Sequence, residues 1–216
     1  MAGTFLSFEG IDGSGKSTQA RLLAQTLRGA GHVVTLTREP GGSPGAEEIR
    51  RLVLEGDPDR WSAETEILLF TAARRDHLEK TIRPSLARGE VVITDRFADS
   101  TRMYQGRDGG LDMVNRLHDL MIGIEPDLTF LIDMDPALGL SRANARAGVL
   151  SRANARAGAE MRFEDMGLDL QAKMRAGFLT LAQANPNRFR VLNGAQAAEV
   201  LAAEVAALAV DYLRGD

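Results

Sequence analysis

Short apolar runs alternate with longer amphipathic stretches along the chain. The runs are rich in Val, Ile, Leu and Phe and most are too short for helices, so they are typical of buried strands. The predicted strands are Phe5–Phe8, Val33–Thr37, Val91–Thr94, Leu128–Ile132 and Phe189–Leu192. The predicted helices are Lys16–Arg28, Glu64–Leu86, Met113–Ile122, Leu168–Ala184 and Ala197–Leu213. This alternation predicts an α/β protein with a doubly wound, five-stranded parallel sheet that helices cover on both faces.

The polar motifs of the chain follow the first three predicted strands. Ligands of such folds bind outside the carboxyl ends of the strands, so we expect these motifs to meet there. No linker divides the 216 residues, which predicts a single domain over residues 1–216.

Composition narrows the classes of function. The formal charge of −4 argues against a nucleic-acid partner. No apolar run is long enough to span a membrane, and Met1–Leu6 do not resemble a signal peptide, so we expect a cytoplasmic protein without membrane contacts. The absence of cysteine excludes disulfides and cysteine–zinc sites. Arginine supplies 23 of the 26 lysine and arginine residues, which is compatible with codon bias or with many phosphate contacts.

A complete phosphate-binding motif connects the first strand to the first helix. The segment Gly10-Ile11-Asp12-Gly13-Ser14-Gly15-Lys16-Ser17 fits GxxxxGK[ST]. Its glycines allow backbone N–H groups to turn toward phosphate oxygens, and the helix N-terminus adds a positive partial charge. We expect Lys16 to reach the β- and γ-phosphates of ATP and Ser17 to offer its hydroxyl to Mg²⁺.

Further motifs occur in an order and spacing that resemble the thymidylate kinases over about residues 5–195. They are Phe8–Gly13, Thr37–Gly42, Glu64–Phe70, Ala72–Arg74, Asp95–Phe97, Ser100–Thr101 and Tyr104–Gly106. The resemblance implies a P-loop nucleoside monophosphate kinase fold. It also implies transfer of the γ-phosphoryl group of MgATP to dTMP, giving dTDP and ADP for the supply of dTTP to DNA synthesis. A homodimer is implied too, with the helical faces around Glu64–Leu86 as the candidate interface.

The residues after the third strand suit transfer between two anions. Arg96 can form a fork of hydrogen bonds to the acceptor phosphate. Asp95 is a candidate for holding Mg²⁺ through water or for orienting Ser17. The alternative interpretation of Asp95-Arg96 is a surface ion pair at a strand end.

The expected acceptor site lies on one helix face and on the segment after the third strand. Phe70 and Arg74 are four residues apart and share a face, although an isolated phenylalanine is more often core. The resemblance implies that Phe70 stacks on thymine, that Arg74 bonds its O4 and that Thr101 meets the base edge. By the same resemblance, Tyr104 crowds the sugar 2′ position and Asp12 lies near the 3′-hydroxyl. The full predicted dTMP set is Asp12, Arg38, Phe70, Arg74, Arg96, Ser100, Thr101, Tyr104 and Gln105.

Gly13 occupies the position at which one form of the family carries a catalytic arginine. The resemblance is therefore to the bacterial type, in which a lid supplies arginine, here over about residues 148–165. Arg152, Arg156 and Arg162 lie in this region, and we expect Arg162 to be catalytic. Arg142 matches a position that stacks on adenine, although Arg152 is an alternative. Asn193 and Gly194 are expected to form an adenine wall.

The sequence SRANARAG occurs twice, at Ser141–Gly148 and Ser151–Gly158. A neutral duplication in a tolerant surface segment is one explanation, and a longer arginine-bearing lid is the other.

Two other functions compete with a thymidylate kinase. One is a P-loop kinase for another nucleotide or nucleoside. The second is a nucleotide-binding module without turnover, for which loss of Lys16 or Asp95 would have been evidence; both residues are present.

Overall fold

The computed structural model describes residues 3–57, 60–153 and 167–215, with only the backbone of residues 108 and 146–153. Its core is a five-stranded, fully parallel sheet in the order β2-β3-β1-β4-β5. The strands are β1 (Thr4–Glu9), β2 (Val34–Arg38), β3 (Val91–Asp95), β4 (Leu128–Asp133) and β5 (Phe189–Asn193). All five predicted strands and the fold class are confirmed.

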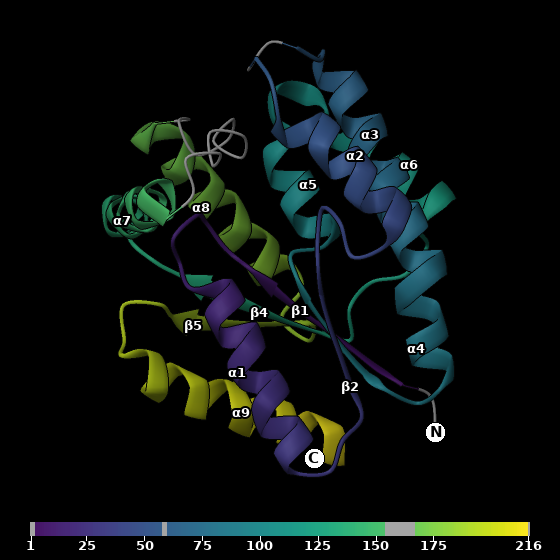
Figure 1. Ribbon diagram of the computed structural model, residues 1–216, viewed down its shortest axis with the longest axis vertical. Helices are drawn as coiled ribbons and strands as arrows, with labels where there is room; N and C mark the ends of the chain where they lie inside the picture. Colours follow the sequence, from purple (N-terminus) through teal and green to yellow (C-terminus); the bar gives the residue numbers. More distant parts are fainter. Residues whose placement is uncertain (1–2, 58–59, 154–166, 216) are drawn as a thin grey trace.

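Helices surround the sheet (Figure 1). They are α1 (Lys16–Gly29), α2 (Pro44–Leu54), α3 (Ala63–His77), α4 (Arg83–Ala87), α5 (Ala98–Tyr104), α6 (Leu111–Met121), α7 (Pro136–Ala153), α8 (Leu168–Ala184) and α9 (Ala198–Arg214). A 3₁₀ turn lies at Arg107–Gly109. The single helix expected over Glu64–Leu86 is wrong in detail, because a π-helical segment at Leu78–Ile82 separates α3 from α4. The helices α2, α5 and α7 were not predicted.

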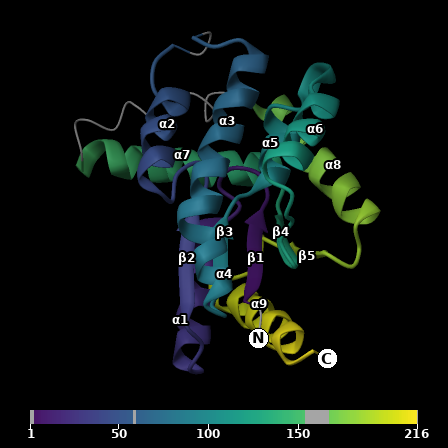
Figure 2. The same cartoon turned by 90° about the vertical axis from the view of Figure 1, so that its right-hand side faces the viewer.

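The alternation of side chains along the strands separates two faces of the core. Leu6 and Phe8 of β1 pack with Leu23 of α1 and Val205 of α9. Phe5 points to the other face, where it meets Phe97 edge-on at 4.9 Å between ring centroids. Figure 2 shows the same sheet from the side, with α1 and α9 below and α2, α3, α5, α6 and α8 toward the opposite end.

The register of the sheet brings the polar motifs together. Phe8 of β1 and Arg38 of β2 both pair with Asp95 of β3, so these three strands end at one level. The P-loop, the segment after Arg38 and the segment after Asp95 therefore leave the sheet side by side. Within the described ranges, no helix has the length and apolar character needed to cross a membrane.

Candidate active site

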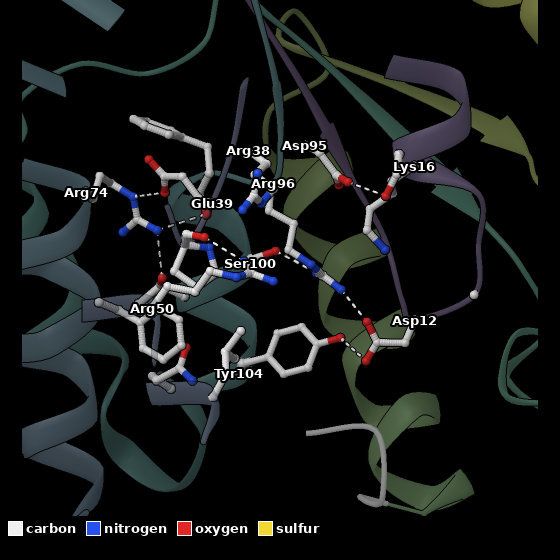
Figure 3. A pocket seen from close by; sticks show the side chains of 18 of the residues that line it. Asp12, Lys16, Arg38, Glu39, Arg50, Arg74, Asp95, Arg96, Ser100 and Tyr104 are labelled. Carbon is white, nitrogen blue, oxygen red and sulfur yellow. Dashed lines mark hydrogen bonds and ion pairs between the residues drawn. The ribbon is translucent and has the colours of Figure 1, made fainter. Parts of the chain in front are cut away.

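A cavity of about 430 Å³ lies over the carboxyl ends of β1, β2 and β3 (Figure 3). One end is formed by the P-loop and the other by α3 and α5. Its lining residues are Asp12, Gly13, Gly15, Lys16, Ser17, Arg38, Glu39, Pro40, Arg50, Leu54, Phe70, Arg74, Asp95, Arg96, Phe97, Ser100, Thr101, Tyr104 and Gln105. The phosphate loop and the motifs predicted to bind the acceptor nucleotide, although far apart in sequence, thus line the same cavity.

The phosphate loop is held in place by Lys16. Its ammonium group is buried and donates to the backbone carbonyl of Ile11 at 2.7 Å. Burial, and then the positive charge of Arg96, lower the pKa of Lys16 to about 8. Gly15 precedes α1 with a left-handed backbone (φ 103), and no atom lies within 4 Å of where its Cβ would be. The loop therefore presents open backbone and a cation to an anion.

Ser17 and Asp95 form the part of the site that suits a divalent cation. The Ser17 hydroxyl donates to one carboxylate oxygen of Asp95. The other oxygen, Oδ1, is buried and has no hydrogen-bond partner among the described residues. Those residues contain no cluster of three or more His, Cys, Asp or Glu side chains that could hold a metal. A hydroxyl, one carboxylate and nucleotide phosphates are the donor set that Mg²⁺ accepts while it keeps several waters, so the residues present fit this ion.

Arg96 has a strained backbone that points its side chain over the P-loop. Its φ of 70° is rare for a residue with a Cβ. The Arg96 N–H donates to Phe8 O at 2.9 Å, and the Thr94 hydroxyl donates to Arg96 O at 2.8 Å, which holds this conformation. Nη1 donates to Ser100 Oγ at 2.8 Å, and Nη2 pairs with Asp12. These contacts use Nη1 and Nη2 and leave Nε on the side of the guanidinium that they do not occupy.

Asp12 is the point at which three elements meet. Besides Arg96, it accepts hydrogen bonds at 3.2 Å from the Tyr104 hydroxyl of α5 and from Nε2 of Gln171 in α8. Gln171 Oε1 also accepts from the Asp12 backbone N–H at 3.2 Å. Burial alone would raise the pKa of Asp12, but Arg96 and Lys16 outweigh it and hold the pKa below its ordinary value. Asp12 is therefore ionised.

The far end of the cavity combines a ring with an arginine. Phe70 is 9% exposed and lines the cavity, so it is mostly buried yet reachable. Arg74 donates from Nε to Glu39 at 2.7 Å and from Nη2 to Thr101 Oγ1 at 2.9 Å. A planar ring beside a fixed guanidinium can hold a planar ligand that carries a carbonyl.

Most predicted phosphate and acceptor residues line the cavity, and a few support it from behind. Gly10, Ile11 and Ser14 lie in the loop but outside the lining set. Glu39, Pro40, Arg50, Leu54 and Phe97 line the cavity and were not predicted as site residues. Glu39, Pro40 and Phe97 belong to motifs that the sequence shows, whereas Arg50 and Leu54 come from a helix that had no clear signal.

The predicted adenine residues lie outside this cavity. Arg142 of α7 donates from Nη1 to the carbonyl of Gly194 at 3.1 Å, which joins the first copy of the repeat to the loop after β5. Asn193 accepts from the backbone N–H of Ala195 at 2.9 Å and shapes that loop. The Arg152 side chain, Arg156 and Arg162 lie outside the described residues.

Three comparisons place the chain among known proteins. The family model of thymidylate kinase matches residues 8–205. A thymidylate kinase of Ruegeria pomeroyi is 66% identical, with 99% of this chain and 98% of that protein covered. One of Caulobacter vibrioides is 47% identical, with 98% of each covered. The crystal structure of thymidylate kinase from Ehrlichia chaffeensis superposes with a TM-score of 0.73 at 34% identity, over 96% of this chain and 98% of that one.

Proposed function

This chain belongs to the thymidylate kinase family, and we propose on that premise how its residues carry out the family reaction. The chain transfers the γ-phosphoryl group of ATP to dTMP, giving dTDP and ADP. The observation that carries this assignment in the structure is one shared cavity with the P-loop at one end and the Phe70–Arg74 pair at the other. A phosphoryl group that moves between two nucleotides needs such a shared space.

In this proposal the P-loop holds the ATP phosphates. The backbone N–H groups of Gly10–Ser17 surround the β-phosphate, and Lys16 turns from the Ile11 carbonyl to the β- and γ-phosphates. Ser17 and Asp95 would hold Mg²⁺, with Asp95 acting through water; the buried Asp95 oxygen without a hydrogen-bond partner supports a cation at this place. The ion, when bound, neutralises phosphate charge. Arg142, Asn193 and Gly194 receive the adenine, because Arg142 already contacts the carbonyl of Gly194.

The acceptor occupies the end formed by α3 and α5. Phe70 stacks on the thymine, Arg74 donates to O4, and Thr101 contacts the base edge. Tyr104 crowds the 2′ position, while Asp12 receives the 3′-hydroxyl. Arg38, Ser100 and Gln105 complete the binding set, and all three line the cavity.

Arg96 stands between the two substrates. Its Nη2 is held by Asp12 in the P-loop and its Nη1 by Ser100 in α5, so the guanidinium spans the line from donor to acceptor. Nε remains to bind the acceptor phosphate. Arg162, which lies outside the described residues, closes over the γ-phosphate from a lid at about residues 148–165. Two arginines and Lys16 then surround the charge that develops during transfer.

Three wider properties belong to the same proposal. The chain acts as one kinase domain over residues 1–216, with a lid segment at about residues 148–165. It works in the cytoplasm on small nucleotides rather than on nucleic acid. Two copies associate through the helical faces around Glu64–Leu86, where Leu68 is 51% exposed although it is apolar.

A coupled assay that follows ADP formation from ATP tests the activity. The acceptors are dTMP, dUMP, dCMP and UMP, with and without Mg²⁺. We expect turnover with dTMP that requires Mg²⁺, and little turnover with dCMP. Turnover with a different monophosphate alone would identify another nucleotide kinase. ATP binding without ADP formation for any acceptor would identify a nucleotide-binding module.

A further inference from the structure

His77 is a buried histidine that does not reach the cavity. It is the last residue of α3, one turn after Arg74, and its side chain is 0% exposed. Nδ1 lies 2.9 Å from Glu39 Oε1, and Nε2 lies 2.7 Å from Thr37 Oγ1. The imidazole thus joins α3 to the end of β2 and to the segment that follows it.

Glu39 connects this histidine to the cavity. Its Oε1 faces His77, and its Oε2 accepts from Arg74 Nε at 2.7 Å, so the two oxygens have separate partners. Burial alone would raise the pKa of Glu39, but Arg74 and the hydrogen bond with His77 hold the pKa below its ordinary value. An ionised carboxylate only accepts hydrogen bonds, and therefore Nδ1 of His77 carries a proton and donates it.

The position of Glu39 decides which donors Arg74 presents. Nε of Arg74 is taken by Glu39, and Nη2 by Thr101 Oγ1 and by the carbonyl of Phe97. Nη1 has no partner among the residues that the structure describes, and Arg74 lines the cavity. The rotation of the Arg74 guanidinium decides whether the two N–H bonds of Nη1 face a ligand. Glu39 fixes that rotation through its contact with Nε.

We infer that His77 is a positioning residue for nucleobase recognition: it holds Glu39, and through Glu39 it aims Nη1 of Arg74 at the base. The inference rests on the proposed function, in which Arg74 bonds the O4 carbonyl of thymine. Without the Nδ1 donor, Glu39 Oε1 would be buried and unpaired. The carboxylate could then turn both oxygens to Arg74 and draw the guanidinium away from Thr101.

The surroundings leave the imidazole one orientation. A Cβ on Gly42 would lie 2.4 Å from His77 Nε2 and 2.4 Å from Thr37 Oγ1, so the Gly42 backbone packs directly on the ring. Gly42 has φ 87°, a conformation that glycine adopts without strain. The ring has no room to flip away from Glu39.

Two amide substitutions separate the two ring nitrogens. His77→Asn places an N–H near the position of Nδ1 and keeps the donor to Glu39. His77→Gln places its amide near Nε2, so it keeps the contact with Thr37 and loses the donor to Glu39. Both remove the ring. A role limited to packing would therefore affect the two variants alike.

The experiment measures kcat and both KM values for the intact enzyme, with dTMP and dCMP as acceptors. For His77→Gln we expect KM for dTMP to rise by about tenfold or more. The preference for dTMP over dCMP should fall, while kcat and KM for ATP stay within about threefold. His77→Asn should remain close to wild type. Adding His77→Gln to Glu39→Gln should change KM little further, because both act through the same carboxylate.

His118→Asn is the matched control. His118 is also buried, at 5% exposed, but it contacts Glu125 and lies outside the cavity lining. It should leave the acceptor preference unchanged. Equal effects of His77→Asn and His77→Gln, or an acceptor preference that survives His77→Gln, would overturn the inference. A wild-type enzyme that is inactive with dTMP would instead overturn the proposed function.

Discussion

The carbonyl oxygen of Gly139 lies 1.9 Å from the point that a Cβ atom on Gly13 would occupy. Helix α7 therefore packs backbone to backbone on the phosphate loop. A Cβ on Gly139 would in turn lie 2.7 Å from the carbonyl of Asp12. An arginine at position 13 is incompatible with this packing, which is the physical reason that the loop has glycine there.

We expect Gly13→Ala to damage both stability and turnover. The new Cβ would force α7 away from the loop, and φ 74° adds strain to any residue with a Cβ. Thermal unfolding and kcat/KM for ATP measure the two effects, with an expected loss in kcat/KM of at least about tenfold.

Gly31→Ala is the control for backbone strain alone. Gly31 has φ 90°, but nothing lies within 4 Å of its Cβ position. It should lose about 1 kcal/mol of stability and no activity. A Gly13→Ala protein no worse than Gly31→Ala would contradict the packing argument.

Lys16→Ala should lower kcat by about a thousandfold while the protein stays folded, because it removes positive charge where the transition state is most anionic. Steady-state kinetics and circular dichroism measure the two properties. Lys173→Ala, which removes an exposed lysine of α8, serves as the control. Near-normal turnover in folded Lys16→Ala protein would refute the P-loop assignment.

Tyr104 should set the preference for deoxyribose. We expect dTMP to be the best acceptor, dUMP to be weaker and UMP to be poor. Its ring lines the cavity and its hydroxyl donates to Asp12 at 3.2 Å, which fixes the ring beside the expected sugar. Tyr104→Leu should raise kcat/KM for UMP relative to dTMP. If wild type uses ribo- and deoxyribonucleotides equally, this role of Tyr104 is wrong.

Glu9 should make stability depend on pH. It is fully buried and accepts from Ser100 Oγ at 2.6 Å and from the Phe97 N–H at 2.8 Å. Burial, and then the charge of Asp99, raise its pKa from 4.5 to about 7. Between these values the folded protein keeps a proton that the unfolded chain releases. The contribution of Glu9 to stability therefore falls as pH rises from about 4.5 to about 7 and is constant above.

Glu9→Gln removes this titration. Relative to wild type, its free energy of unfolding should be larger at pH 8 than at pH 5, because only wild type loses stability over this range; urea denaturation at both pH values measures this. Glu48 is exposed, and Glu48→Gln serves as the control. The difference between its free energy of unfolding and that of wild type should change much less between pH 5 and pH 8. A difference that is independent of pH would show that Glu9 does not bind a proton on folding in this range.

Arg162→Ala should reduce kcat far more than it weakens dTMP binding, because its contact forms mainly on closure of the lid. If Arg162→Ala is silent while Arg152→Ala or Arg156→Ala is inactive, the catalytic arginine belongs to the repeat.

Deletion of Ser141–Leu150 tests the repeat itself. It places the identical second copy directly after Leu140, so the α7 residues that contact Gly194 and the P-loop return in the same register. We expect nearly unchanged stability and substantial activity. Loss of phosphoryl transfer would show that the longer lid has a function.

The sequence by itself determined the strands, the parallel sheet and the phosphate loop. Buried runs such as Leu128–Ile132 and the spacing from Gly10 to Ser17 act through local backbone geometry, which a linear pattern records. Short α5 has only 7 residues, too few for a clear helical period, although Ser100, Thr101 and Tyr104 within it were recognised as parts of motifs.

Only the tertiary structure decided the partners of the charged residues. Asp12 and Arg96 are 84 positions apart and Arg74 and Glu39 are 35 apart, yet each pair is in contact. These contacts depend on the order β2-β3-β1, which brings three strand ends to one level. The backbone contact of Gly13 with Gly139 and the role of His77 behind Glu39 arise in the same way. They are set by how close separate elements approach in space, and that distance is not encoded in any local pattern of residues.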